Sequence, residues 1–246
     1  MKTILITGGL GGIGEGLTEH FLSKGCNVII NYNNKNKAIE AKKIYNETYG
    51  EDKILFFKAD VSKYDEAAEM FEASIEKFGL VDGLFNCASI NKDAFIKDMD
   101  YDMWQSVINV NLTGVFNCSK LFARQYNGNN GFIINFSSGT AVQGRAKGAN
   151  YCSSKAGVIN LTKNFAIEYA PDIRINCIGL GMIMTDEIYN RYDLGNEKKL
   201  EAMNNSIPLG YIGNVSDVVE MADFLAFKGR YITGQLIYVN GGMYMH

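Results

Sequence analysis

Short apolar runs alternate with amphipathic segments along the chain, with a period of roughly 25–30 residues. The apolar runs predict strands at residues 2–7, 28–32, 54–57, 81–85, 132–136, 173–178 and 233–239. The amphipathic segments predict helices at residues 15–23, 38–49, 65–78, 98–126 and 151–170. Such alternation is typical of parallel βαβ units with right-handed crossovers. We therefore predict an α/β protein with a doubly wound, seven-stranded parallel sheet flanked by helices.

No linker or repeat divides the chain, so residues 1–246 are expected to form a single domain. One segment departs from the alternation, because residues 184–209 are polar and irregular. An insertion at the carboxyl end of a strand is where a substrate lid would lie. We predict a lid there.

Composition narrows the classes of function. Hydrophobic residues make up 47% of the chain and the net charge is −3, so there is no electrostatic case for binding nucleic acid or an anionic membrane. No apolar run approaches the ~20 residues of a membrane span. The first apolar run is too short for a signal peptide, and a cytoplasmic location is expected.

The chemistry available to the chain is limited by its histidines and cysteines. Only His20 and His246 occur, which argues against a histidine-based triad or metal site. The five cysteines are scattered, without a C-x-x-C pair, and are expected to be reduced. We predict no bound metal, and tyrosine, lysine and carboxylates remain as proton-transfer groups.

A glycine-rich turn follows the first predicted strand. It reads Gly8-Gly9-Leu10-Gly11-Gly12-Ile13-Gly14 and leads directly into a predicted helix. Glycines let the backbone approach a diphosphate, and the helix N-terminus offers free N–H groups to it. This placement favours a nucleotide-binding loop over a plain tight turn.

The end of the second predicted strand bears on the choice of cofactor. In a dinucleotide-binding fold this end faces the adenosine ribose, where an acid would hold a free 2′-hydroxyl. Tyr32, Asn33 and Asn34 stand there instead, followed by Lys35 and Lys37. We therefore predict NADP, with NAD less favoured. The alternative is that both lysines are the solvated start of the next helix.

Three residues form the candidate catalytic group. Tyr151 and Lys155 are four positions apart, so on a helix they share one face. An ammonium beside a phenol favours the phenolate, and we expect the pKa of Tyr151 to be lowered. Ser138 ends an apolar run and is expected to hold a carbonyl oxygen together with Tyr151. The Y-x-x-x-K spacing alone is weak and also fits a surface helix.

Two further residues have alternative interpretations. Asn111 interrupts the apolar side of a predicted helix, where it either solvates a kink or binds a water near Lys155. Asp60 follows the third predicted strand, where it either meets the adenine or caps the next helix. Ser62 competes for that cap.

Taken together, the motifs resemble those of the short-chain dehydrogenase/reductase family over essentially the whole chain. They are Thr7-Gly8-x-x-x-Gly12-x-Gly14, Asn86-x-Ala88, Asn111, Ser138 and Tyr151-x-x-x-Lys155. Within that family the chain is most similar to 3-oxoacyl-thioester reductases, of the acyl-carrier-protein and acetoacetyl-CoA types. The resemblance implies a Rossmann fold and NADPH-dependent reduction of a ketone.

The resemblance also implies roles for individual residues. Tyr151 would donate the proton, Lys155 would hold the nicotinamide ribose, Ser138 would bind the substrate oxygen, and Asn111 would anchor a water that relays protons to Lys155. The implied cofactor-binding residues are Gly8, Leu10, Gly11, Gly12, Ile13, Gly14, Tyr32, Asn33, Asp60, Val61, Asn86, Ala88, Tyr151, Lys155, Gly181, Ile183 and Thr185.

Four positions depart from the family pattern. Cys87 and Ser89 replace an asparagine and a glycine after the fourth strand, and Leu180 replaces a proline after the sixth. Gly11 stands where NADP-dependent relatives often carry a basic residue. The prediction of NADP therefore depends mainly on the missing acid near Tyr32.

The substrate is less defined than the chemistry. Basic residues in the loop before Tyr151 and in the predicted lid either meet the phosphates of coenzyme A or phosphopantetheine, or are ordinary surface charge. They are Arg145, Lys147, Arg191, Lys198 and Lys199. The segments around Asn129 and Asp172 are not notably basic, so docking of an acidic carrier protein lacks support. A sugar, polyol or steroid substrate and a non-catalytic NADP-binding protein remain alternatives.

Self-association is expected from the resemblance, because relatives commonly form tetramers through the helices at residues 98–126 and 157–170 and the C-terminal strand. Phe165, Ala166 and the closing residues 242–245 are compatible with a buried partner surface. We therefore expect a homotetramer.

Overall fold

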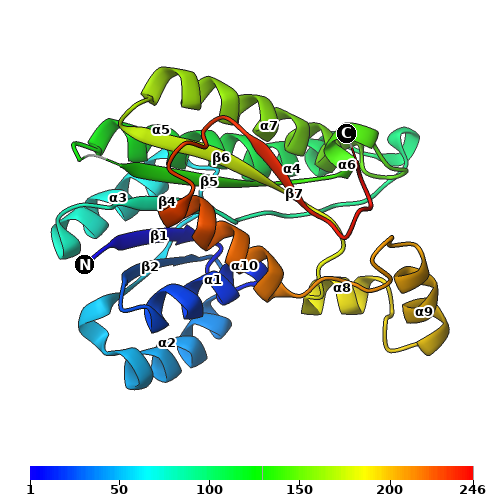
Figure 1. Cartoon of the computed structure of the whole chain (residues 1–246), viewed down its shortest axis with the longest axis horizontal. Helices are drawn as coiled ribbons and strands as arrows, with labels where there is room; N and C mark the ends of the chain where they lie inside the picture. Colours follow the sequence, from blue (N-terminus) through cyan, green and yellow to red (C-terminus); the bar gives the residue numbers. More distant parts are fainter. Residues whose placement is uncertain (129, 246) are drawn as a thin grey trace.

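A seven-stranded parallel sheet forms the centre of the computed structural model, which describes residues 1–128 and 130–245 (Figure 1). The strand order is β3-β2-β1-β4-β5-β6-β7, and every neighbouring pair is parallel. The strands are β1 (Thr3–Thr7), β2 (Asn27–Tyr32), β3 (Ile54–Lys58), β4 (Gly83–Asn86), β5 (Gly131–Ser138), β6 (Ile173–Leu180) and β7 (Leu236–Val239). The predicted doubly wound sheet is confirmed.

Helices cover both faces of the sheet (Figure 1). The helices are α1 (Gly12–Ser23), α2 (Lys35–Tyr49), α3 (Tyr64–Phe78), α4 (Tyr101–Ile108), α5 (Gly114–Gln125), α6 (Thr140–Gln143), α7 (Ala149–Tyr169), α8 (Asp186–Arg191), α9 (Glu197–Asn205) and α10 (Val215–Asp223). Helices α1, α2 and α10 pack on one face, and α3, α5 and α7 pack on the other.

Alternate side chains of each strand enter the two helical layers. Ile4 and Ile6 of β1 pack in the same core cluster as Phe21 of α1. Leu5, between them, packs in the opposite cluster with Phe122 of α5. Strands of a parallel sheet are buried on both faces, which is why they read as nearly continuous apolar runs in the sequence.

The predicted helix at residues 98–126 is not continuous. A π-helical turn at Asn109–Thr113 separates α4 from α5. The Asn111 side chain accepts a hydrogen bond of 2.8 Å from the backbone N–H of Ile90 and donates one of 2.9 Å to the carbonyl oxygen of Ile90. The buried Asn111 therefore ties this turn to the loop after β4. π-Helical turns inside α-helices often lie at functional sites.

Three other expectations need correction. Residues 184–209 are not irregular, because Thr185 and Asn196 cap the short helices α8 and α9. The last strand begins at Leu236 rather than at residue 233, since Gly234 adopts a positive φ of 71°. Phe165 and Ala166, expected on a partner surface, are buried in the chain's own core.

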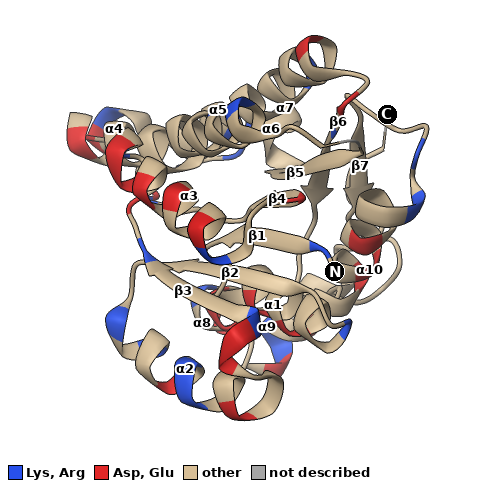
Figure 2. Ribbon diagram, turned by 90° about the vertical axis from the view of Figure 1, so that its left-hand side faces the viewer, with Lys and Arg blue, Asp and Glu red and all other residues tan. Residues whose placement is uncertain are grey.

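Charged side chains do not form one basic face. In Figure 2, lysines and arginines are interspersed with acidic residues along the helices. None of the helices described here has both the length and the apolar character needed to cross a bilayer. Over residues 1–128 and 130–245, no group of three or more His, Cys, Asp or Glu side chains is placed to hold a metal ion. All five cysteines are free thiols.

Candidate active site

A cavity of about 530 Å³ opens at the carboxyl ends of the strands. Its walls come from the glycine loop after β1, the end of β2, the loop after β4, the end of β5, α7, and the segment after β6. The strand order reverses between β1 and β4, and ligands of doubly wound sheets bind at such a switch point. The fold therefore places a binding cavity where the predicted motifs converge.

Most predicted site residues line this cavity. They are Gly8, Leu10, Gly11, Gly12, Ile13, Gly14, Tyr32, Asn33, Ala88, Ser138, Tyr151, Lys155, Gly181, Ile183 and Thr185. The structure does not bring Asp60, Val61, Asn86 and Asn111 to the cavity wall.

The glycine loop has the shape that a diphosphate requires. Gly8 and Gly12 have positive φ angles of 63° and 43°. A Cβ on Gly14 would overlap the carbonyl oxygen of Gly8, so the first turn of α1 sits directly against the loop. Glycine at these positions keeps the cradle open for the diphosphate of a dinucleotide. The residues present therefore fit a nicotinamide dinucleotide.

Asn31 holds the glycine loop in place. Its side-chain oxygen accepts a hydrogen bond of 3.1 Å from Gly8 N–H, and its backbone carbonyl accepts one of 2.9 Å from Gly9 N–H. The Asn31 amide also donates to the carbonyl oxygen of Ala59 at 3.0 Å. Sequence reasoning missed this residue, although a polar side chain within an apolar run was a usable signal.

The end of β2 presents polar and basic groups to the cavity. Tyr32, Asn33, Asn34 and Lys37 line it, whereas Lys35 does not. Asn34 also caps α2 by accepting a hydrogen bond of 3.0 Å from Asn36 N–H. No carboxylate stands among these β2 and α2 residues at the wall.

Helix α7 and strand β5 bring together the three predicted catalytic side chains. The Lys155 amine, 4% exposed, donates a hydrogen bond of 3.0 Å to the carbonyl oxygen of Phe136. Ser137 donates one of 2.9 Å to the carbonyl oxygen of Lys155. The Ser138 hydroxyl lies 3.1 Å from that of Thr140, and the Lys155 amine lies 5.7 Å from the centre of the Tyr151 ring.

The expected lowering of the Tyr151 pKa does not hold for the chain by itself. The pKa of Tyr151 is raised to about 12, mainly by burial and then by the negative charge of Glu187, while the positive charge of Arg145 opposes the shift. Burial also lowers the pKa of Lys155 to about 8. The physical reason is that burial removes water from the charged phenolate, and this cost is larger than the stabilisation by nearby positive charges. In addition, the Lys155 amine donates its hydrogen bond to a backbone carbonyl and not to the phenol.

The predicted residues away from the wall have protein partners. Asp60 accepts hydrogen bonds from the backbone N–H and hydroxyl of Ser62 at 3.0 and 2.7 Å. Asn86 donates to Ser119 and Asn135 at 3.0 and 2.8 Å. The amide of Asn111, besides its bonds to Ile90, donates to Ser154 at 3.3 Å. These side chains brace the elements that carry the cavity wall.

All four departures from the family pattern, Gly11, Cys87, Ser89 and Leu180, lie at the wall. Cys87 lines the cavity, and burial raises the pKa of its thiol, which keeps it protonated. Leu180 lines it as well, and a Cβ on the following Gly181 would lie 2.6 Å from the Cα of Asn240. The turn after β6 is therefore held closely against the C-terminal segment without a proline.

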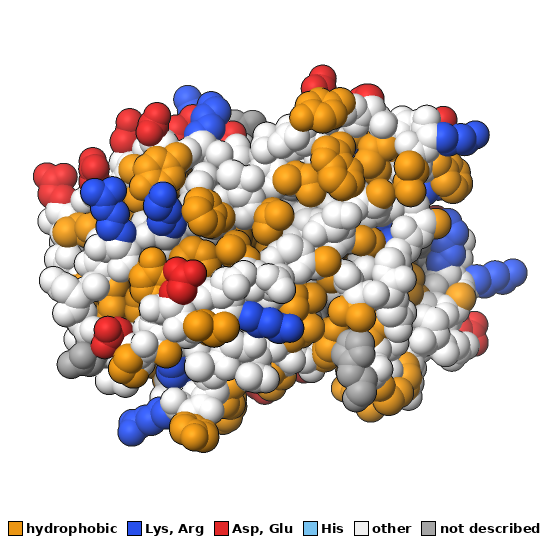
Figure 3. Space-filling model, turned by 90° about the horizontal axis from the view of Figure 1, so that it is seen from above, with side chains coloured by type: hydrophobic (Ala, Val, Ile, Leu, Met, Phe, Trp, Pro, Cys, Tyr) orange, Lys and Arg blue, Asp and Glu red, His pale blue; other side chains and the backbone are white. Residues whose placement is uncertain are grey.

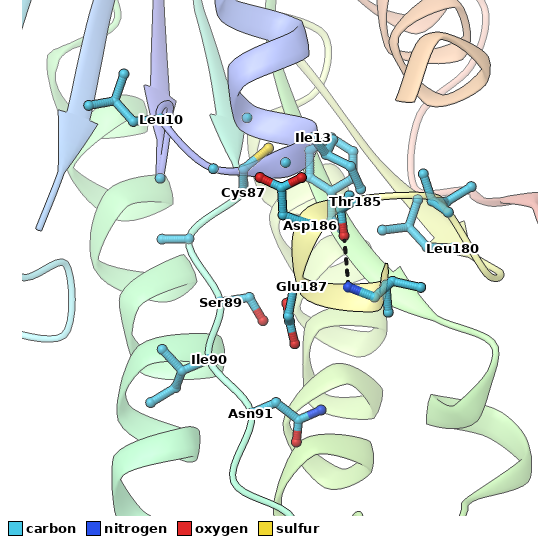
Figure 4. A pocket seen from close by; sticks show the side chains of 18 of the residues that line it. Leu10, Ile13, Cys87, Ser89, Ile90, Asn91, Leu180, Thr185, Asp186 and Glu187 are labelled. Atoms are coloured by element: carbon cyan, nitrogen blue, oxygen red, sulfur yellow. Dashed lines mark hydrogen bonds between the residues drawn. The ribbon is translucent and has the colours of Figure 1, made fainter. Parts of the chain in front are cut away.

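Sequence reasoning missed most of the far wall. Figure 4 shows Asp186 and Glu187 of α8 reaching into the same cavity as Ser89 and Asn91 of the loop after β4. Thr185 begins α8 by accepting a hydrogen bond of 3.3 Å from Ile188 N–H, drawn as the dashed line in Figure 4. The remaining residues of the wall are Ile90, Phe136 and Ile188, which were not predicted, and Asn34, Lys37, Cys87, Leu180 and Arg191, which were discussed from the sequence but not included in the predicted site.

The chain was compared with known proteins. The family model of short chain dehydrogenases matches residues 2–193. A 3-oxoacyl-[acyl-carrier-protein] reductase, FabG, of Staphylococcus epidermidis is 38% identical over 247 residues, covering 99% of each chain. The crystal structure of a short-chain dehydrogenase/reductase (glucose/ribitol dehydrogenase) from Brucella melitensis superposes with a TM-score of 0.91 at 27% identity, covering 100% of this chain and 97% of that one.

A second similar structure contains a cofactor. It is that of ElxO with NADP bound, with a TM-score of 0.89 and 30% identity, covering 98% of each chain. The family match, the parallel sheet and the glycine cradle agree with one another. The chain belongs to the short-chain dehydrogenase family and is an NAD(P)-dependent oxidoreductase that acts on hydroxyl or ketone groups.

Proposed function

We propose that this protein is an NADPH-dependent reductase that converts a 3-oxoacyl thioester to its 3-hydroxy product. The observation that carries the proposal is that Ser138, Tyr151 and Lys155 line one cavity with the glycine loop. The named relatives support the substrate class, since the FabG proteins of S. epidermidis and Thermotoga maritima are 38% and 36% identical to this chain.

In the proposed reaction, the nicotinamide when bound supplies the hydride. Tyr151 then gives its phenolic proton to the carbonyl oxygen as general acid, and its raised pKa keeps that proton in place before reaction. The Ser138 hydroxyl donates a hydrogen bond to the same oxygen as it gains charge. A charged Lys155 holds the nicotinamide ribose and stabilises the phenolate that remains on Tyr151.

NADP rather than NAD is supported by the charges at the β2 end of the cavity. Tyr32, Asn33 and Lys37 line it, and no acid from β2 or α2 stands there to repel a 2′-phosphate. The related ElxO structure contains NADP. We propose that Lys37, which lines the cavity, contacts the 2′-phosphate, and that Lys35, which does not line it, makes no such contact.

The basic residues near the mouth do not favour one carrier over another. Arg145 and Arg191 are paired with Asp93 at 2.6 and 3.4 Å, and Lys199 is paired with Asp193 at 2.8 Å. These pairings favour the interpretation of ordinary ion pairs over dedicated phosphate contacts. We therefore assign a thioester substrate, and the experiment below distinguishes coenzyme A from a carrier protein as the group that bears it.

The experiment is NADPH oxidation by purified protein with a panel of ketones. Acetoacetyl-CoA, a short carrier-linked 3-oxoacyl group, a sugar or polyol and a steroid ketone separate the candidate substrates. We expect the thioesters to be reduced fastest. Strong activity on a polyol or sterol without thioester activity would assign that compound class as the substrate instead. Binding of NADPH without turnover of any ketone would show that the protein is a non-catalytic binder.

We also propose a homo-oligomer, with a tetramer as the expected state. Figure 3 looks onto the side of α5 and α7, where hydrophobic side chains reach the surface. Phe116 of α5 is 41% exposed and Ile167 of α7 is 79% exposed. Light scattering after a sizing column tests the state, and a monomer at micromolar concentration would contradict it.

A further inference from the structure

A cluster of three charged side chains, Asp93, Arg145 and Arg191, extends from the Tyr151 ring to the cavity wall and has no part in the proposed reaction. Asp93, in the loop after β4, accepts hydrogen bonds of 2.6 and 3.0 Å from the two terminal nitrogens of Arg145. The second oxygen of Asp93 also lies 3.4 Å from Arg191 of α8. The side chains of Asp93, Arg145 and Arg191 are 28%, 24% and 27% exposed, so the cluster is partly open to water.

The first arm of the cluster leads to Tyr151. Arg145 lies with its guanidinium carbon 5.6 Å from the centre of the Tyr151 ring, close enough for a cation–π contact. A bidentate pair fixes the plane of a guanidinium as well as its position. The Asn91 side-chain oxygen accepts a further hydrogen bond of 3.3 Å from Arg145. Asn91 and Asp93, two residues of one loop, therefore hold the guanidinium beside the Tyr151 ring.

The second arm leads to α8. Arg191 ends this helix and lies 3.3 Å from Glu187, one turn earlier. Glu187 lines the cavity, and its negative charge raises the pKa of Tyr151. A helix of six residues is not stable by itself, so α8 depends on tertiary contacts such as the Asp93 pair.

We propose that Asp93 is a positioning residue that fixes Arg145 against the Tyr151 ring and Arg191 of α8 through a single carboxylate, so that the proton donor and the lid are held as one unit. The proposal rests on the proposed function, in which Tyr151 donates the proton. It adds a role for three side chains that touch neither the reacting carbonyl nor the glycine loop. An asparagine at position 93 keeps the shape but cannot balance two guanidinium charges.

The two arms are separable by substitution. Asp93→Asn breaks both, Arg145→Met breaks the arm to Tyr151, and Arg191→Met breaks the arm to α8. Asp193→Asn is the matched control, because it removes a carboxylate from an exposed pair in the same region, with side chains 66% and 56% exposed. Thermal melts are recorded first to show that each variant folds. If Asp93→Asn does not fold, Arg145→Met and Arg191→Met test the proposal.

The first readout is hydrogen–deuterium exchange of residues 185–192 in the protein without substrate. Asp93→Asn and Arg191→Met are expected to speed exchange there by about twofold to fivefold, the factor for one lost ion pair between partly exposed side chains. Arg145→Met and Asp193→Asn are expected to leave it unchanged. This readout uses no substrate, so it holds even if the thioester assignment fails.

The second readout is steady-state kinetics with the best ketone of the panel. Arg145→Met is expected to lower kcat by about tenfold with the KM for NADPH unchanged, because it acts on Tyr151 alone. Arg191→Met is expected to raise the KM for the ketone more than it lowers kcat. Wild-type exchange at residues 185–192 in Asp93→Asn, or wild-type kcat in Arg145→Met, would overturn the proposal.

Discussion

The Lys155 amine donates a hydrogen bond of 3.0 Å to the carbonyl oxygen of Phe136, and so helix α7 is joined to the end of β5 inside the cavity. Both partners line the wall. The bond sets the distance between the amine and the Tyr151 ring, 5.7 Å to its centre. The charge of Lys155 is therefore placed beside the phenol and held there by the backbone.

The first prediction concerns pH. Burial lowers the pKa of Lys155 from 10.5 to about 8, so the amine is charged below that pH and neutral above it. The proposed role needs the charged form, and Tyr151, with its raised pKa, keeps its proton throughout. We expect kcat/KM for NADPH, which reports the free enzyme, to fall as the pH rises above about 8.

The control for the pH profile is Lys163→Met, which removes an exposed amine from the same helix and is expected to leave the profile unchanged. A profile that stays level up to pH 10 would contradict the assignment of Lys155.

The same shift predicts a change in stability. The unfolded chain keeps the Lys155 proton up to about pH 10.5, whereas the folded chain releases it near 8. Because the unfolded state binds more protons between these values, the Lys155 contribution to the free energy of unfolding rises with pH across this window. Chemical denaturation of wild type and Lys155→Met at several pH values measures it. If the free energy of unfolding changes with pH equally in wild type and Lys155→Met, the pKa of Lys155 is not lowered by folding.

A third prediction concerns the choice of cofactor. Lys37→Met is expected to lower the preference for NADPH over NADH by about threefold to tenfold, the effect of one partly exposed charge on a phosphate. The matched control is Lys35→Met, since Lys35 lies on the same helix but does not line the cavity. The ratio of kcat/KM for the two cofactors is the measurement. If the preference for NADPH falls equally in Lys37→Met and Lys35→Met, the cause is the general positive charge of the helix and not a contact of Lys37 with the phosphate.

A fourth prediction tests the glycine cradle without activity. Gly14→Ala is expected to lower the free energy of unfolding by about 1–3 kcal/mol, because the new methyl group would overlap the carbonyl oxygen of Gly8. Gly11→Ala is the control, since its nearest neighbour for a Cβ is the same oxygen at 3.8 Å. Urea denaturation of both variants decides the matter. If the free energy of unfolding falls equally in Gly14→Ala and Gly11→Ala, close packing of α1 on the glycine loop is not the cause of the loss.

The sheet and most of the cavity wall were predictable because both follow from local pattern. Parallel strands buried on two faces read as apolar runs, and the residues after them meet at one edge of the sheet. Tyr32 and Ser138 were found in this way, whereas Gly181 was expected only from the resemblance to the family. Lys37 was named with Lys35 as positive charge near the end of the second strand, and Asn31, within that strand, was within reach of the same reasoning.

The remaining features depend on contacts between distant parts of the chain. Nothing near Asp93 in the sequence shows that Arg145, 52 positions later, is its partner. Asn86 was expected beside the cofactor, but the partner of its amide is Asn135, 49 positions away. The direction of the Tyr151 pKa shift was missed for the same reason, because burial is set by the packing of the whole site.

The central claim is that Tyr151 gives the proton to the substrate oxygen, and one comparison tests it most directly. NADPH oxidation with acetoacetyl-CoA is measured for Tyr151→Phe and wild type, with Tyr211→Phe, an exposed tyrosine, as control. The account predicts that Tyr151→Phe loses about 100-fold to 10,000-fold in kcat while NADPH still binds with wild-type affinity by fluorescence. Turnover by Tyr151→Phe at the wild-type rate would contradict it.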